Sequence, residues 1–211
     1  MALMNLLAGA RKRRTMPIFP LGVVLYPGAR LPLRIFEARY MDMAKACLKE
    51  SSPFGVCLIR EGQEVGVPAV PEAVGCAARI ADCDMEELGI LKVKAEGLER
   101  FRIVSREVSK SGLIVGEVED IPAEPRATEA PGLAQSAAFL RKVIAGIGED
   151  RFVPPFDFED AAWVSFRLAE ILPLRLDAKQ KLLELTDASM RLAILHRFLR
   201  QQGLVTSGTD S

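Results

Sequence analysis

Prolines and glycines divide an apolar stretch near the start of the chain, residues 16–40. Four prolines and two glycines lie within it. Proline lacks the N–H that a helix interior needs, so the stretch cannot form one helix. It is predicted as extended segments joined at Pro20–Gly22 and at Pro27–Gly28. From Phe36 the apolar residues recur at helical spacing, which predicts a helix that ends near Glu50.

Short runs typical of β-strands follow this helix. The clearest alternation of apolar and polar residues is at 91–96, where lysines and a glutamate alternate with leucine, valine and alanine. The other predicted strands span 54–60, 75–84, 101–108 and 113–120, with a loop at 65–73 and a turn at Lys110–Gly112. Many short strands with close turns favour an antiparallel barrel, because closure removes the sheet edges.

The last third of the chain has helical composition. Residues 122–131 hold three prolines and no large apolar side chain, which is typical of a connector. Helices are predicted at 133–147, 161–172, 178–185 and 188–202, with Asp177 and Asp187 as N-caps of the last two and Gly203 as a C-terminal stop. The expected core of this small bundle consists of Leu182, Leu183, Leu185, Leu192, Ile194, Leu195, Phe198 and Leu199. The expected domains are a flexible basic tail at 1–15, a barrel at 16–121, a linker at 122–131, a helical bundle at 132–203 and a flexible tail at 204–211.

Several short motifs carry a family resemblance. In chain order they are Phe19-Pro20-Leu21, Pro27-Gly28, Leu31-Pro32-Leu33, Ile35-Phe36-Glu37, Arg39-Tyr40, Phe54-Gly55-Val56, Gly75, Gly97 and Arg100-Phe101. They resemble the amino-terminal, substrate-binding domain of the ATP-dependent protease Lon, of peptidase family S16. The resemblance implies an α+β fold: a PUA-like antiparallel β-barrel with one inserted helix, followed by a small α-helical bundle. It also implies a module that recognises polypeptide substrates.

Neither the ATPase motif nor the protease nucleophile motif of Lon has a counterpart in the sequence. A phosphate-binding loop needs glycine followed by lysine, and none of the sixteen glycines is followed by lysine. No serine lies in the Gly-Pro-Ser-Ala-Gly turn of the family's nucleophile. The one histidine, His196, has no cysteine or serine at motif spacing and is interpreted as a packing or half-exposed helix residue. We therefore expect no enzyme activity and no cofactor.

Neither the cysteines nor the clustered carboxylates have the spacing of a metal site. Cys47, Cys57, Cys76 and Cys83 include no Cys-x-x-Cys pair, and each is predicted to be a buried free thiol. The carboxylates Asp82, Asp84, Glu86 and Glu87 are interpreted as solvated turn residues. Leu88-Gly89 follows them where Lon proteins usually have Asp-Gly.

The charge balance argues against nucleic acid. The chain has 28 basic and 28 acidic residues, and four of the bases stand together at Arg11–Arg14, so the remainder is slightly acidic. The order of basic and apolar residues at the start is not that of a secretory signal, and no apolar run is long enough to span a membrane. We expect a cytoplasmic protein whose first fifteen residues are a loose tail or precede a start at Met16.

The candidate peptide-binding residues are Val24, Leu25, Tyr26 and Arg39, three from the proline-punctuated segment and one from the strand-to-helix corner. At that corner Glu37 suits a first helical turn, and a structural role for Arg39 is favoured over binding of a peptide carboxylate. The expected partners are unfolded or degron-bearing polypeptide and an AAA+ protease, with weak self-association. The alternatives are an RNA-binding PUA-like domain and, with least support, an uncharacterised enzyme.

Overall fold

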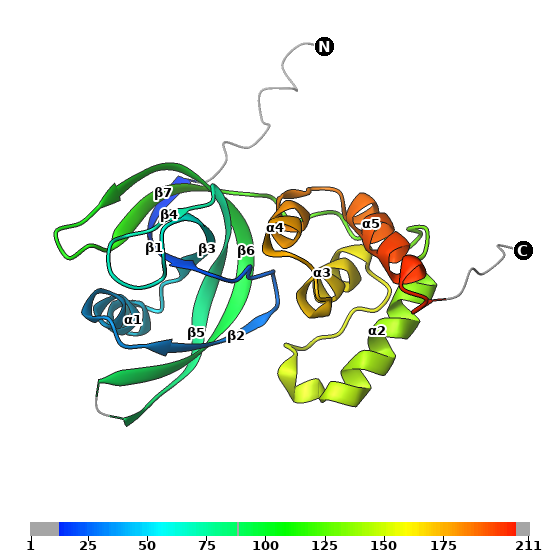
Figure 1. Cartoon of the computed structure of the whole chain (residues 1–211), viewed down its shortest axis with the longest axis horizontal. Coiled ribbons are helices and arrows are strands. Elements are labelled where there is room, and N and C mark those ends of the chain that lie inside the picture. Colours follow the sequence, from blue (N-terminus) through cyan, green and yellow to red (C-terminus); the bar gives the residue numbers. More distant parts are fainter. Residues whose placement is uncertain (1–12, 88, 206–211) are drawn as a thin grey trace, which may run out of the picture.

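The computed structural model describes residues 13–87 and 89–205, and it places a β-barrel beside a group of helices (Figure 1). The barrel part consists of β1 (Arg13–Leu21), β2 (Arg30–Ile35), α1 (Ala38–Glu50), β3 (Phe54–Glu61), β4 (Val70–Pro71), β5 (Val74–Glu87), β6 (Ile90–Val108) and β7 (Ile114–Asp120). The helical part consists of α2 (Leu133–Ile147), the short 3₁₀ helix η1 (Glu149–Arg151), α3 (Ala161–Ile171), α4 (Leu176–Glu184) and α5 (Ala188–Gln201).

Five strands form a closed ring of pairings in the order β1-β7-β6-β5-β3, and β3 returns to β1. The β1–β3 pair is parallel, whereas the other pairings are antiparallel. Parallel neighbours need a long crossover, and here α1 supplies it. The predicted α+β class, with one helix inserted in a mainly antiparallel barrel, is confirmed.

Strand boundaries differ from the prediction in several places: the short strand β4 lies within the expected loop at 65–73, and β5 continues to Glu87. Residues 91–96 and 101–108 belong to one long strand, β6, because the residues between them continue the pairing with β5, Gly97 with Ala78 and Arg100 with Cys76. The first half of β6 also pairs with β2 and the second half with β7. At the start of the chain, β1 begins at Arg13, so residues 13–15 pair with β7 and are not part of a tail. The expected tails at 1–12 and 206–211 lie outside the described residues.

The helix boundaries follow local capping chemistry. Asp160 accepts hydrogen bonds from the N–H groups of Ala162 and Trp163, and Asp187 caps α5, as predicted, through the N–H of Met190. The prediction for Asp177 was wrong: α4 begins at Leu176, and Asp177 lies in its first turn, where a negative charge also suits the helix dipole. At the other end of α5, Gly203 has a φ of +68°, the left-handed conformation of a helix stop.

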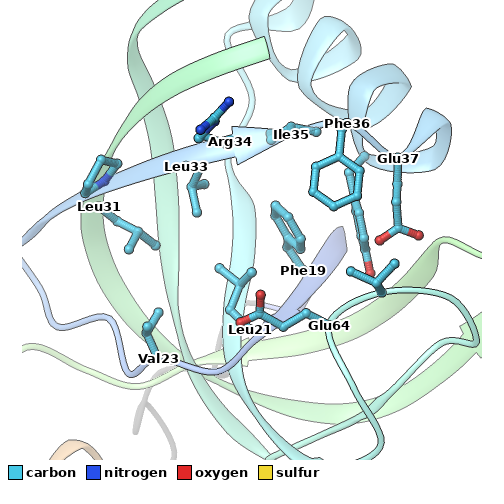
Figure 2. A pocket seen from close by; sticks show the side chains of 13 residues that line it. Phe19, Leu21, Val23, Leu31, Leu33, Arg34, Ile35, Phe36, Glu37 and Glu64 are labelled. Atoms are coloured by element: carbon cyan, nitrogen blue, oxygen red, sulfur yellow. The ribbon is translucent and has the colours of Figure 1, made fainter. Parts of the chain in front are cut away.

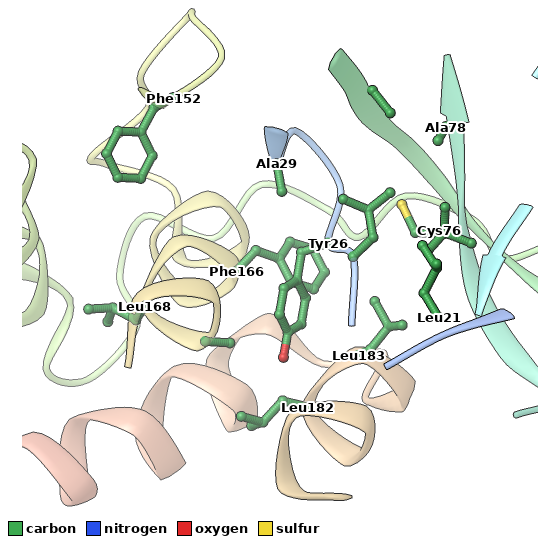
Figure 3. Close-up of a cluster of buried hydrophobic side chains, with 14 of the residues drawn as sticks. Leu21, Tyr26, Ala29, Cys76, Ala78, Phe152, Phe166, Leu168, Leu182 and Leu183 are labelled. Carbon is green, nitrogen blue, oxygen red and sulfur yellow. The ribbon is translucent and has the colours of Figure 1, made fainter. Parts of the chain in front are cut away.

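One apolar core runs through the barrel and the helices (Figure 3). The same cluster contains Leu21 and Cys76 from the barrel and Phe166 and Leu183 from the helices. This continuity differs from the expectation of a barrel and a bundle with separate cores. Within the expected bundle core, Ile194 is exposed, because it lies outside the face of α5 that carries the buried residues Leu192, Leu195 and Leu199.

The connector also differs from the expected loose linker. It has no regular secondary structure, but the side chain of Glu124 is only 4% exposed and contacts two buried arginines. Its Oε1 lies 2.6 Å from Nη2 of Arg100 on β6, and its Oε2 lies 2.6 Å from Nη2 of Arg191 on α5. Both guanidinium groups also donate to the backbone carbonyl of Leu185. One carboxylate therefore joins the barrel to the helices.

A second set of contacts holds the β1–β2 loop against the helices. Arg167 of α3 donates to the backbone carbonyls of Pro27, at 2.7 Å, and Gly28. Tyr26 is fully buried, and its hydroxyl donates to the carbonyl of Lys179 at 2.9 Å. On the barrel side Gly97 donates to Ala29, and a Cβ at Gly97 would lie 2.2 Å from the carbonyl oxygen of Tyr26. Glycine is required there because two backbones meet.

The cysteines are free, but only three are buried. Burial raises the pKa of the Cys57 thiol, and it raises the pKa of Cys76 to about 12. The prediction that Cys83 is buried was wrong. Its part of β5, residues 81–85, is exposed on both faces of the strand.

Among the described helices, none is long and apolar enough to cross a membrane.

Replacing Glu124 with glutamine should destabilise the protein strongly, because two buried guanidinium groups lose their shared counter-charge. We expect the free energy of unfolding to fall by about 3–5 kcal/mol, measured as a lower urea midpoint with an unchanged slope. Glu159→Gln is the matched control, since that side chain is 81% exposed and 3.7 Å from Arg126. Equal midpoints for the two variants would contradict this role of Glu124.

A pair of glycine substitutions tests the backbone contact at Gly97. Gly97→Ala should lower the free energy of unfolding by about 2 kcal/mol or more, because the new methyl group displaces the Tyr26 carbonyl. Gly146→Ala in α2 has no atom within 4 Å of the new Cβ, and it should raise stability by up to about 1 kcal/mol because alanine favours helix. Urea unfolding of both variants by circular dichroism measures the difference, and a neutral Gly97→Ala would refute the close contact.

Candidate functional site

The structure buries the four candidate peptide-binding residues to different extents. Leu25 and Tyr26 are 4% and 0% exposed and pack in the core, and Arg39 is 8% exposed. Val24 is partly buried against the same core. The sequence could not distinguish these apolar residues from surface ones, since the groups that meet Tyr26 come from Phe166 on α3 and Lys179 on α4, more than a hundred residues later. The buried residues are therefore not available to a ligand in this conformation.

Arg39 is committed to contacts within the protein. Its Nη2 lies 2.8 Å from Oε2 of Glu37, its Nη1 donates to the carbonyl of Gly112 at 3.1 Å, and its guanidinium lies over the Tyr40 ring. Glu37 has an extended backbone and is the N-cap residue of α1, without a side-chain cap bond. The pair thus connects the start of α1 to the β6–β7 turn, in line with the structural role favoured from the sequence.

A hollow of about 310 Å³ lies beside these residues, between β2, the end of β1 and the loop that follows β3 (Figure 2). We name it the β2 groove. It is lined by Phe19, Leu21, Val23, Leu31, Pro32, Leu33, Arg34, Ile35, Phe36, Glu37, Tyr40, Glu64 and Val65. Many of these residues belong to the segment of residues 16–40 that the sequence singled out, although its three apolar candidates do not line the groove.

The floor of the β2 groove is aromatic. The rings of Phe19 and Tyr40 stack with their centroids 4.0 Å apart, and both side chains are buried. Burial raises the pKa of the Tyr40 hydroxyl, so this group stays neutral at physiological pH. The floor is therefore a buried, uncharged surface suited to apolar side chains.

The rim of the groove exposes large apolar side chains. Phe36 and Val65 are each 55% exposed, and Val23 is 38% exposed. Single exposed apolar residues are normal on protein surfaces, but several around one hollow mark an interaction site. The sequence signal for Phe36 was its place in the Ile35-Phe36-Glu37 motif, whereas nothing in the local sequence of Val65 indicated a site.

Two carboxylates add negative charge to the groove. Glu37 is paired with Arg39, as described above. Glu64 accepts a hydrogen bond from the N–H of Gly22 at 2.5 Å, and it has no cationic partner within residues 13–87 and 89–205. In Figure 2 the Glu64 carboxylate lies on the groove side of β2 with Phe19 and Leu21, whereas the Arg34 guanidinium lies on the other side of the strand.

The other residues considered for catalysis or metal binding, His196 and the clustered carboxylates, make structural contacts where the structure describes them. His196 contacts the hydroxyl of Ser136 through Nδ1 at 3.1 Å and so links α5 to α2. Burial lowers its pKa, which keeps the imidazole neutral at physiological pH.

Asp82 forms an ion pair with Lys94 at 2.8 Å within the exposed part of the β5–β6 ladder rather than in a turn. The side chains of Glu86 and Glu87, and Leu88, lie outside what the structure describes. No group of three or more metal-binding side chains occurs among the described residues.

Comparison with known proteins identifies the same architecture elsewhere. A family model described as the ATP-dependent protease La (LON) substrate-binding domain matches residues 15–201, which include the helices as well as the barrel. The Lon protease of Xanthomonas oryzae pv. oryzae is 28% identical over 193 residues, covering 85% of this chain and 22% of that protein. The Lon protease of Cytophaga hutchinsonii is 26% identical over 186 residues, covering 83% and 23%. The chain thus spans about a fifth of the length of these relatives.

Two solved structures share the fold. The Lon N-terminal domain protein from Xanthomonas campestris has a TM-score of 0.71 and 36% sequence identity, covering 88% of this chain and 98% of that one. The N-terminal domain of Lon protease from the Mycobacterium avium complex has a TM-score of 0.66 at 18% identity, covering 89% and 98%. The chain therefore belongs to the family of Lon substrate-binding domains.

Proposed function

We propose that this protein is a non-catalytic module that captures unfolded or degron-bearing polypeptide in the β2 groove, in protein quality control. Membership of a substrate-binding family supports the general role. The observation that carries the proposal is the aromatic floor of the groove, with Phe36, Val65 and Val23 exposed around it. Unfolded chains expose apolar side chains, and burying these against the groove drives binding.

The partner in this role is an AAA+ protease. The aligned region is less than a quarter of the length of the matching Lon proteases, and the sequence of this chain has neither the phosphate-binding loop nor the Lon nucleophile motif. In this role the module holds polypeptide without cutting it and presents it to the protease. The protein would then act in the cytoplasm, where such proteases meet unfolded substrates.

Substitutions at the rim of the groove test the binding site. Phe36→Ser and Val65→Ser should each weaken binding to reduced, carboxymethylated serum albumin, a permanently unfolded protein. Partial burial of such a side chain contributes about 1.5 kcal/mol, equivalent to about tenfold in affinity. Ile194→Ser is the control, because this residue is 49% exposed on α5 and does not line the groove.

Titrations with fluorescently labelled carboxymethylated albumin measure these affinities, and circular dichroism verifies that each variant is folded. Equal affinity for all three variants and the unaltered protein would place the binding site elsewhere. A loss of affinity confined to Ile194→Ser would place the binding site on the helical part.

The salt dependence of binding distinguishes polypeptide from RNA. Apolar contacts are not screened by salt, so the affinity for carboxymethylated albumin should change by less than about twofold between low salt and about 0.2 M. Binding to a structured RNA through several lysines and arginines would instead fall about a hundredfold or more. The full chain with Arg11 and Lys12 replaced by alanine is used, because Arg13 and Arg14 belong to β1. Tight, salt-sensitive RNA binding without affinity for unfolded protein would support the RNA alternative.

A further inference from the structure

The strand β2 has one edge without a partner strand. Its residues 30–35 pair with residues 91–96 of β6, and no described strand pairs with the other edge. An unpaired edge presents a row of N–H and C=O groups that another extended chain can pair with. Pro32 contributes no N–H to this row and so limits, without abolishing, the bonds available.

The unpaired edge of β2 faces the β2 groove. Side chains of a strand alternate between its two faces, so a hollow over one face is lined by every second residue. Here consecutive residues from Leu31 to Ile35 all line the groove. This pattern is expected where a hollow follows the edge of a strand.

Charge distinguishes among the chains that this edge could accept. The Glu37 carboxylate is neutralised by Arg39, whereas the Glu64 carboxylate accepts a hydrogen bond from the N–H of Gly22 and forms no ion pair within the described part of the chain. An acidic peptide would therefore meet an uncompensated negative charge. A peptide with lysine or arginine near Glu64 would supply the missing counter-charge.

We propose that the β2 groove holds an extended segment of polypeptide, paired as an added strand with the free edge of β2. Its apolar side chains contact the Phe19–Tyr40 floor and Phe36, and a lysine or arginine side chain pairs with Glu64. This proposal rests on the proposed function and deepens it, since it specifies the conformation of the substrate and its charge. Main-chain hydrogen bonds supply affinity that is independent of the peptide sequence. The floor supplies a preference for apolar side chains, and Glu64 supplies one for lysine or arginine.

The strand geometry is tested with backbone-methylated peptides. The probe is a fluorescent ten-residue peptide with leucine at alternate positions and one central lysine, titrated against the full chain. In an added strand only every second N–H points to β2. N-methylation should therefore weaken binding at alternate positions, by about fivefold for each lost hydrogen bond, and have little effect at those between.

The role of Glu64 is tested by exchanging the lysine of the probe for norleucine, which keeps the apolar stem without the charge. The exchange should weaken binding to the unaltered protein about three- to fivefold and have no effect on the Glu64→Gln variant. Glutamine retains an acceptor for the Gly22 N–H, so the loop should keep its position. Glu61→Gln is the control, because Glu61 is exposed beside Arg60 and does not line the groove.

The outcomes separate this proposal from the proposed function. Loss of affinity for carboxymethylated albumin in Phe36→Ser, together with a peptide series that shows no alternation, would retain polypeptide capture and overturn strand addition. An equal lysine preference in the Glu64→Gln variant would overturn the pairing with Glu64. Self-association that competes with the peptide and is lost in Phe36→Ser would identify a second copy of the chain as the occupant, which also overturns the proposal.

Discussion

The arrangement of this protein depends on one buried carboxylate, Glu124, between two buried guanidinium groups. Isolated charges are too costly to bury, so Arg100 on the barrel and Arg191 on α5 are compatible with the core only when they share this counter-ion. Both arginines also donate to the Leu185 carbonyl just after α4. These directional contacts fix how the helices dock, which apolar packing alone would leave less specific.

The docking of the helices has consequences for the groove. Arg167 on α3 holds the Pro27 and Gly28 carbonyls, and β2 begins two residues later at Arg30. One wall of the β2 groove is therefore supported from the helical part, through the β1–β2 loop. The family match likewise extends through the helices, to residue 201.

The groove combines a buried aromatic floor with exposed apolar side chains at its rim. Its floor is a stacked aromatic pair within the core, and its wall is a strand with one free edge. Val65 lies on an exposed loop between Gly62 and Gly66, which both have positive φ. The floor and the loop thus both offer apolar surface to the groove. In the proposed function, this surface would receive apolar side chains of unfolded polypeptide.

The sequence by itself determined the elements whose signals are local. Prolines and glycines divided residues 16–40 into strands, polar alternation marked β6, and Asp187 and Gly203 marked the ends of α5, because each of these effects acts within a few residues. The motif glycine Gly97 was visible in the sequence, but its cause, the Tyr26 carbonyl, was not. Only the tertiary structure decided that Tyr26 and Leu25 are buried, that Glu124 pairs with Arg100 and Arg191, and that Val65 and Glu64 join Phe36 at the groove. These outcomes depend on residues far apart in the chain. The burial of Tyr26 and the pairing of Glu124 are set where the helices dock on the barrel, whereas the groove residues meet when the barrel itself closes.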